Sequence, residues 1–319
     1  MKKIFCAVLA LAAMASCSKE YIVAENKQAI GFGEAFVDNG TRSDYSTDKD
    51  VDEFLVYGTV QGEFDGSTPV QIFKGAAVSR PDGLDGYNED VAWICNETQY
   101  WVPNAKYNFT AVVDGELNKD QSGNYLNTIN FTVADGDANK DLLLAAAAAS
   151  VNNAGVVTGT NTKGYVAFTF NHLLSKLQFT ITSNIGAGYS IDVTGITVTG
   201  VAQKGIYNVA GDADDDGDDD GAWTQDGTTT TTLTFGSEGA YETRQILPVA
   251  QTLNVTISYD IYFGGTKISE ATKSGTISSR SYDKKTVYNI TAAITMTNEI
   301  EFTVEAVNGW DNGGNIDLQ

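Results

Sequence analysis

The chain has 319 residues, of which 42% are hydrophobic, and its formal net charge is −21. This length is enough for one or two full hydrophobic cores, and typical domain sizes favour two. So large a negative charge repels nucleic acid and anionic lipid headgroups, so no nucleic-acid partner is expected. Thr, Ser, Gly, Asn and Tyr are plentiful while helical periodicity is scarce, which predicts an all-β fold.

The N-terminus has the pattern of an export signal. Lys2 and Lys3 give a positive start, and residues 4–15 form an apolar run too short to span a bilayer as a stable helix. Small residues then precede Cys17, an arrangement similar to a bacterial lipobox, in which the cysteine is diacylated and becomes the new N-terminus. We expect residues 1–16 to be a lipoprotein signal peptide and lipid on Cys17 to anchor the protein in a membrane. The alternative is an ordinary signal peptide with a chance cysteine.

A short strand is predicted near the start of the exported chain. Residues 30–37 read IGFGEAFV and have strand character, and a turn-rich segment at residues 38–45 follows at once. That segment carries Arg42. A strand beside an exposed basic loop is a candidate site of proteolytic processing.

Further strands are predicted before residue 150. Alternating apolar residues, separated by Asp, Gly and Pro turns, predict strands at residues 54–60, 70–73, 92–95, 107–113 and 129–133. Residues 142–149 are ambiguous, because Leu and Ala favour helix. Since the rest of the chain reads as β, we predict a strand there as well.

Aromatic residues are dense in this first half: Tyr87, Trp93, Tyr100, Trp101, Tyr107 and Phe109. They would form either a sugar-stacking platform or the aromatic core of a first domain. Trp93, Tyr107 and Phe109 fall in alternating strands, which favours the core. A glycan platform at Tyr100 and Trp101 is kept as the alternative.

Two alternating apolar runs meet at residues 168–182, FTFNHLLSKLQFTIT, across a short polar joint. The Gly/Asn/Thr-rich segment 152–164 precedes them and reads as a connection between two halves of the chain. We therefore predict that a second domain begins here, with domains at residues 43–164 and 165–319. Core positions are expected at Phe168, Phe170, Leu177, Phe179 and Ile181.

Strand patterns continue to the end of the second half. Apolar alternation predicts strands at residues 191–201, 231–235, 245–249, 253–263, 267–277, 287–296 and 300–307. Gly264 and Gly265 lie between two of these strands and supply the positive φ angles of a two-residue hairpin turn.

An acidic run between residues 212 and 221 contains the pattern D-x-D-x-D-G twice. Carboxylates at alternate positions with a glycine at the sixth resemble a Ca²⁺-binding loop. The candidate ligands are Asp212, Asp214, Asp216, Asp218 and Asp220. The twelfth position of each frame is Trp223 or Gly227 where the pattern requires Glu, so a solvated acidic hairpin tip is favoured over a Ca²⁺ site. No other metal or cofactor is expected.

Catalytic constellations are sparse, and we expect no enzyme. His172 is the single histidine and lies at the joint of two core strands without a nucleophile motif nearby, so a structural role is favoured. Cys95 would be the one cysteine left after export and lipidation, and its apolar neighbours indicate a buried side chain. Carboxylate pairs suited to glycoside hydrolysis stay open, because spacing in sequence does not fix spacing in space.

Several motifs, taken in order, resemble the fimbrillins, the subunits of Bacteroidales type V pili. The segment FNHLLSKLQFTI at residues 170–181 is similar to the signature that begins the second half of these proteins. Supporting similarities run along nearly the whole chain: the lipobox at Cys17, the strand before Thr41-Arg42-Ser43, the block TQYWVPNAKYNFTA, the segment after Asp141, and the ending from Tyr288 to Trp310.

The resemblance implies two tandem transthyretin-like β-sandwich domains and a defined route of assembly. A lipoprotein precursor reaches the outer membrane, and an Arg-specific protease cuts between Arg42 and Ser43. The cut releases residues 17–42, a lipidated propeptide that includes the first strand. The side chains expected to leave the core are Ile30, Phe32, Ala35 and Val37.

Another subunit then fills the vacated groove by β-strand addition, and the product is a surface fimbrium that supports adhesion. In the family the donor strand comes from the C-terminal region, which here points to residues 300–318. The implied partners are other fimbrillin subunits, the outer membrane through the lipid, and a surface receptor that the sequence does not identify. The alternative is an unpolymerised, tip or anchor lipoprotein that binds glycans.

Overall fold

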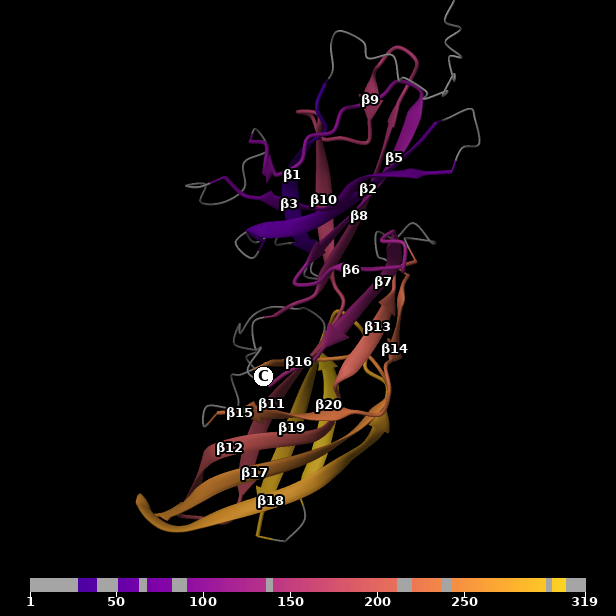
Figure 1. The fold of residues 1–319 in the computed structure, drawn as a ribbon. Coiled ribbons are helices and arrows are strands. Elements are labelled where there is room, and N and C mark those ends of the chain that lie inside the picture. The colour runs from indigo at the N-terminus through magenta and orange to yellow at the C-terminus, as the bar shows by residue number, and fades with distance from the viewer. Residues whose placement is uncertain are drawn as a thin grey trace, which may run out of the picture.

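The computed structural model describes residues 28–38, 51–62, 68–81, 91–135, 140–210, 220–236, 243–296 and 300–307. Within these ranges the chain forms strands, turns and loops and no helix, which confirms the all-β prediction. The described residues therefore include no helix long and apolar enough to cross a bilayer. Figure 1 shows an elongated arrangement, with one sheet at the top, two at the bottom and a small sheet between them.

The upper sheet has the strand order β1-β10-β8-β5-β2-β3-β4, with β9 paired to β8. Its strands are β1 (Gly31–Asp38), β2 (Glu53–Gly62), β3 (Val70–Ser79), β4 (Ile94–Cys95), β5 (Ala105–Val113), β8 (Leu143–Val151), β9 (Val157–Thr158) and β10 (Tyr165–His172). The β1–β10 pair is parallel and the other neighbours are antiparallel.

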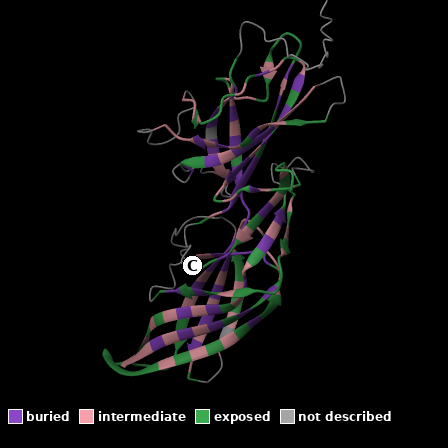
Figure 2. Cartoon of the chain, in the orientation of Figure 1, coloured by how far each residue is buried: buried purple, intermediate pink, exposed green. Residues whose placement is uncertain are grey.

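The core of this sheet is built from aromatic rings. Its fully buried rings include Phe73, Phe109, Phe168 and Phe170, and Phe54 is almost fully buried. Neighbouring rings pack edge to face or tilted, which is the favoured geometry of aromatic pairs. Figure 2 shows buried residues alternating with more exposed ones along the strands, as period-two patterning requires.

Strand β8 confirms the strand predicted at residues 142–149. It lies between β5 and β10, so its backbone groups pair on both sides. Leu143, Ala145 and Ala149 face the aromatic core and are nearly inaccessible to solvent. Pairing and burial by the rest of the fold therefore override the helix propensity of its alanines.

The lower region contains two four-stranded sheets, β16-β11-β19-β20 and β15-β12-β17-β18. The strands are β11 (Ser175–Asn184), β12 (Tyr189–Ala202), β15 (Thr230–Phe235), β16 (Arg244–Ile246), β17 (Gln251–Phe263), β18 (Thr266–Arg280), β19 (Thr286–Thr295) and β20 (Glu301–Val307). The predicted hairpin turn joins β17 to β18, where Gly264 and Gly265 have φ angles of 57° and 82°.

Both lower sheets contribute to one large hydrophobic cluster. Leu177, Phe179, Val255 and Ile290 are among its fully buried members, while Ile181 is half-buried. Four of the five predicted core positions are thus buried, and they divide between two clusters. Phe168 and Phe170 belong to the upper cluster, and Leu177 and Phe179 to the lower one.

The small sheet between them has the order β14-β13-β7-β6, from β6 (Leu117–Lys119), β7 (Tyr125–Thr132), β13 (Lys204–Asn208) and β14 (Ala222–Gln225). It contacts the upper sheet through Tyr125, whose ring lies 4.8 Å from that of Tyr57 and whose hydroxyl donates to the Lys74 carbonyl at 2.8 Å. The small sheet therefore combines strands from both halves of the sequence.

The strand pairing differs from the division expected at residue 164. Strand β10, on the C-terminal side of that boundary, pairs with β8 and β1 in the upper sheet. After β10 the chain enters the lower cluster at Leu173 and Leu174, between β10 and β11. Upper-sheet strands also contribute to that cluster, through Tyr57, Val112 and Leu144. Apolar alternation marks a buried face without specifying which core it enters, so the pattern alone does not assign this strand to a sheet.

Candidate assembly interface

The predicted displaced strand lies within the described residues. Cys17, Arg42 and Ser43 lie outside the described residues. The same holds for four of the candidate Ca²⁺ ligands, Asp212, Asp214, Asp216 and Asp218, while Asp220 is described and exposed. Among the described residues no group of three or more His, Cys, Asp or Glu side chains is placed to hold a metal ion.

One face of β1 enters the upper core. Ile30 just before the strand, Phe32 and Ala35 are 5%, 0% and 3% exposed, and Val37 is half-buried. These are the four side chains predicted to leave with the strand. Phe32 and Ala35 are three residues apart and would face opposite sides of a regular strand. The pairing with β10 shifts register between them, which brings both side chains to the same face.

Phe32 occupies the middle of the aromatic core. Its ring centroid lies 5.3 Å from Phe73 and 5.9 Å from Phe109, both edge to face, and 6.0 Å from Phe168 in a stacked pair. These partners come from β3, β5 and β10. Removing β1 would therefore open the core to solvent at its centre.

Both edges of β1 are hydrogen-bonded. One edge forms the parallel ladder with β10. On the other edge, the Trp93 amide donates to the Phe32 carbonyl at 2.9 Å, the Ile30 amide donates to the Gln99 carbonyl at 2.8 Å, and the Trp101 amide donates to the Gln28 carbonyl at 3.1 Å. The partner residues Trp93, Gln99 and Trp101 lie just before and after β4, the last strand in the sheet order. The strand β1 therefore connects the two ends of the sheet.

The start of β2 is held by Arg80, which follows β3. Val51 is fully buried, and Arg80 Nη2 donates to its carbonyl at 2.7 Å. The Arg80 amide also donates to the Asp52 carbonyl at 2.8 Å, and its guanidinium lies 5.6 Å from the Trp93 ring centroid. A chain cut upstream of Val51 would keep this anchor.

The predicted donor segment is partly occupied within its own chain. Residues 301–307 form β20, an edge strand antiparallel to β19. Phe302 and Val304 are half-buried against the lower core, and the Val304 carbonyl accepts from Arg280 Nη1 at 3.3 Å. Residues 308–318 lie outside the described residues.

The aromatic block divides between core and surface. Trp101 is 8% exposed, and its ring lies edge to face with Tyr107 at 4.8 Å and with Phe109 at 6.2 Å. Burial raises the pKa of Tyr107, and its hydroxyl oxygen accepts a hydrogen bond from the Val102 amide at 2.6 Å. Among the described members of the aromatic set only Tyr100, at 44%, is well exposed, and Tyr87 lies outside the described residues. A glycan platform needs both the Tyr100 and the Trp101 ring to be accessible, and the Trp101 ring is buried.

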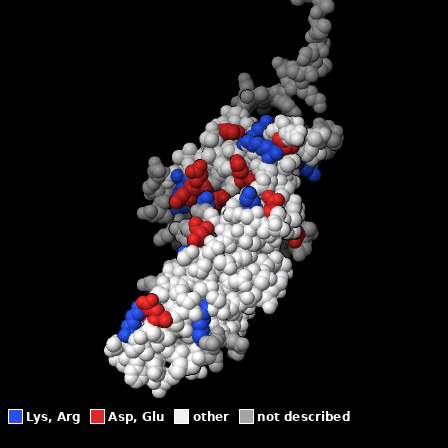
Figure 3. Space-filling model, turned by 60° about the horizontal axis from the view of Figure 1, so that its bottom comes forward, with Lys and Arg blue, Asp and Glu red and all other residues white. Residues whose placement is uncertain are grey.

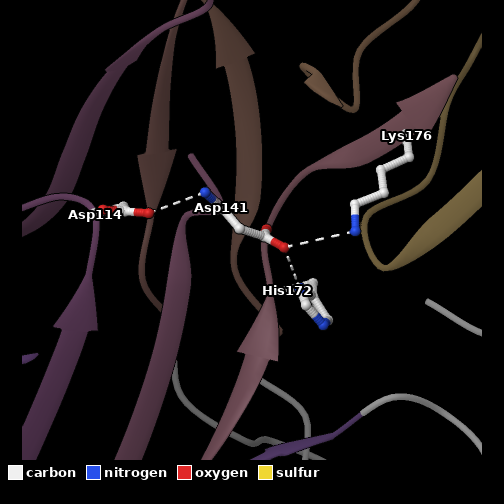
Figure 4. A network of polar contacts seen from close by, with 4 residues as sticks. All are labelled: Asp114, Asp141, His172 and Lys176. Atoms are coloured by element: carbon white, nitrogen blue, oxygen red, sulfur yellow. Dashed lines mark hydrogen bonds and ion pairs between the residues drawn. The ribbon is translucent and has the colours of Figure 1, made fainter. Parts of the chain in front are cut away.

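His172 takes part in a polar network at the joint between the two cores (Figure 4). Its Nδ1 lies 2.8 Å from Asp141 Oδ2, which also lies 3.9 Å from Lys176 Nζ. The Asp141 amide donates to Asp114 Oδ2 at 3.0 Å. Burial lowers the pKa of His172, helped by the positive charges of Lys176 and Lys285, against the opposing effect of Asp141.

This network joins residues at the ends of neighbouring strands, which supports the structural interpretation of His172. Cys95 is half-buried, and burial raises the pKa of its thiol, as expected of an unreactive cysteine. Charged side chains on the face shown in Figure 3 form small groups of mixed sign with a broad uncharged area between them. The described residues on that face form no stripe of one sign that would steer a polyelectrolyte.

Comparisons with known proteins give one family match and several similar folds. The sequence model of the family described as fimbrillin-like matches residues 41–310. Among solved structures, the fold is similar to that of a fimbrial protein from Bacteroides vulgatus, with a TM-score of 0.54, 17% identity, and 90% of this chain and 100% of that chain covered.

Two further structures are described as candidate cell adhesion proteins. The one from Bacteroides uniformis has a TM-score of 0.55 and 17% identity, and covers 90% of this chain and 99% of its own. The one from Bacteroides ovatus has a TM-score of 0.54 and 12% identity over the same shares. A search of curated protein sequences found no match.

Proposed function

The chain belongs to the fimbrillin-like family, and from this premise we propose that it is the lipoprotein precursor of a structural subunit of a cell-surface fimbrium. In this proposal the protein is exported, diacylated at Cys17 and carried to the outer membrane. A protease then cuts between Arg42 and Ser43, β1 leaves with the propeptide, and a strand from another subunit takes its place. The fibre supports adhesion and performs no catalysis, and it needs no cofactor.

The observation that carries the proposal is the position of β1. Its Phe32 is fully buried at the centre of the upper core, while the strand precedes the segment that contains Arg42. Burial of a large apolar side chain is worth about 1.5–3 kcal/mol, as an upper estimate, so an emptied groove favours refilling by another strand. The two hydrogen-bonded edges would give the incoming strand its direction and register.

We further propose that the two hydrophobic clusters correspond to two tandem transthyretin-like sandwich domains. The upper cluster would be the domain that loses β1, and the joint at Leu173 and Leu174 would divide the two, rather than residue 164. The anchor of Val51 by Arg80 supports this proposal, because it would keep β2 in place after the cut. Residues 43–50 would then form the new N-terminus.

The test is N-terminal sequencing of the protein at the cell surface, together with a search for SDS-resistant ladders before and after trypsin. A new N-terminus at Ser43 with ladders is the expected result. An Arg42→Ala variant should keep Cys17 as its N-terminus and form no ladders, whereas Lys49→Ala, a basic residue in the same segment, should behave like the wild type. Cys17 without ladders in the wild type would sink the assembly proposal and favour an unpolymerised or anchor role.

Glycan binding through Tyr100 and Trp101 has less support, because Trp101 is buried. A titration of tryptophan fluorescence with host and plant polysaccharides separates the two functions. A structural subunit should give no response. A saturable change that is lost in Tyr100→Ala would establish glycan binding instead.

A further inference from the structure

On the face of β1 opposite Phe32, the side chain of Tyr165 packs against Gly31 and Gly33. A Cβ atom added to Gly31 would lie 2.8 Å from Tyr165 Cδ1, and one added to Gly33 would lie 3.1 Å from Cδ2 and 3.2 Å from the Tyr165 Cβ. Gly31 is also the register partner of Tyr165 on β10. The ring of Tyr165 therefore lies across both glycines, while Phe32 between them points into the core.

The backbone does not require glycine at these two positions. The described glycines with positive φ angles do not include Gly31 or Gly33, so an L-residue could adopt either conformation. The requirement is one of space. An added Cβ on Gly33 would meet the Cβ and Cγ of Tyr165, the root of the side chain, which rotation about its own bonds moves least.

The backbone of Tyr165 is itself fixed. Its amide donates to Asn161 Oδ1 at 3.0 Å, and its carbonyl accepts from the Asn161 amide at 2.9 Å. These two bonds close a turn just before β10. A bulky residue opposite Gly33 would therefore have to displace an anchored strand end rather than a free side chain.

We propose that Tyr165 is the residue that determines which strand can occupy the β1 groove. An occupant must carry glycine at the two positions that flank a large apolar residue, in the pattern of Gly31-Phe32-Gly33. The inference rests on the proposed function, in which β1 is released and replaced. It adds the chemical identity of the replacement.

The sequence of this chain then points to a partner of another kind. Two glycines separated by one residue occur only at residues 31–33 and 186–188, and the second pair lies at a turn, where Gly186 and Gly188 have φ angles of 114° and 82°. Residues 300–319 contain no position pair of Gly, Ala or Ser with this spacing. The strand that completes this subunit would therefore come from a different protein, and a second copy of this chain would be a poor donor.

The experiment uses the full chain with a recognition site for a sequence-specific protease inserted after Arg42. After cleavage, fluorescent peptides compete with the released fragment, and bound peptide is measured after gel filtration. Three peptides are compared: residues 28–38, the same peptide with Gly31→Val and Gly33→Val, and residues 300–319. Valine raises strand propensity, so weaker binding of the valine peptide would report steric exclusion.

We expect the peptide of residues 28–38 to bind, and the valine peptide to bind about tenfold to a hundredfold more weakly, because overpacking disfavours a filled site. The peptide of residues 300–319 should bind as weakly as the valine peptide. In a Tyr165→Ala chain the valine peptide should regain most of its affinity, whereas Tyr165→Phe should keep the discrimination. If Tyr165→Ala fails to fold, the comparison of peptides on the Tyr165 chain still decides.

The outcomes separate the inference from the function beneath it. Failure of the peptide of residues 28–38 to exchange would overturn strand replacement itself, and the selection with it. Equal binding of the native and valine peptides would overturn the role of Tyr165 alone. Tight binding of residues 300–319 would leave strand replacement standing and overturn the claim of a different partner, because a second copy would then suffice.

Discussion

Replacing Phe32 with alanine should strongly destabilise the uncut protein. The side chain is fully buried and contacts rings from three other strands, Phe73, Phe109 and Phe168. Large-to-small substitution of a buried Phe costs about 3–5 kcal/mol, from lost transfer free energy and the cavity left behind. Because Phe32 and these three partners all belong to the upper cluster, most of this loss should fall on the upper core.

Urea denaturation of the uncut chain, followed by tryptophan fluorescence, measures the effect. Trp93 and Trp101 lie beside the upper core, so their emission reports its unfolding. The matched control is Phe263→Ala, the same chemical change at a side chain that is 51% exposed, which should cost about 1 kcal/mol or less. A loss for Phe32→Ala no larger than that of the control would refute the role of Phe32 as the central side chain of the core.

A second measurement connects this stability to assembly. After cleavage downstream of β1 and removal of the fragment, the remaining chain should unfold at the same urea concentration whether it came from the wild type or from Phe32→Ala, since residue 32 is gone from both. The uncut chains should differ. A difference that persists after removal of the fragment would mean that the substitution alters the fold elsewhere.

Three further predictions concern other parts of the molecule. The pKa of His172 is lowered from its ordinary value of 6.5, so the unfolded chain binds the proton more readily than the folded chain does. The free energy of unfolding should therefore fall as the pH drops below 6.5. His172→Gln should make the free energy of unfolding, measured by denaturation, depend less on pH, and an unchanged pH dependence would contradict this prediction. Gly275→Val should destabilise the lower core by about 1–3 kcal/mol in thermal unfolding, because a Cβ at residue 275 would collide with the Phe302 ring. The double variant Gly275→Val, Phe302→Ala should recover part of this loss. If it recovers none, the collision is not the cause. Titration with Ca²⁺ should release no heat, and a saturable signal lost in Asp216→Asn would instead establish a site in the acidic run.

Much of the architecture could be predicted because alternation is a local property. The apolar face of residues 30–37 and the long hairpin at Gly264 and Gly265 are both visible in the sequence. The alanine-rich strand β8 was harder, since its strand state comes from neighbours on both sides rather than from its own propensity. The prediction of a strand there rests on context, namely the β character of the rest of the chain.

What the sequence could not provide is which face meets which core. Phe168 and Phe179 have the same alternating environment, yet one lies in the upper cluster and the other in the lower. Likewise, the glycines at 31 and 33 are visible, but their reason is Tyr165, far away in sequence. Such pairings depend on long-range strand order, which a single sequence does not encode as a local pattern.

The short passage through Leu173 and Leu174 also has a mechanical consequence. The Leu173 carbonyl accepts from Trp223 Nε1 at 2.6 Å, and the Leu174 carbonyl accepts from the Lys285 amide at 2.8 Å. Beyond it, β11 runs parallel to β19 over ten consecutive register pairs. A pulling force along the chain would act parallel to this ladder and load its hydrogen bonds together in shear. The β11–β19 pairing would therefore break as a unit rather than one hydrogen bond at a time.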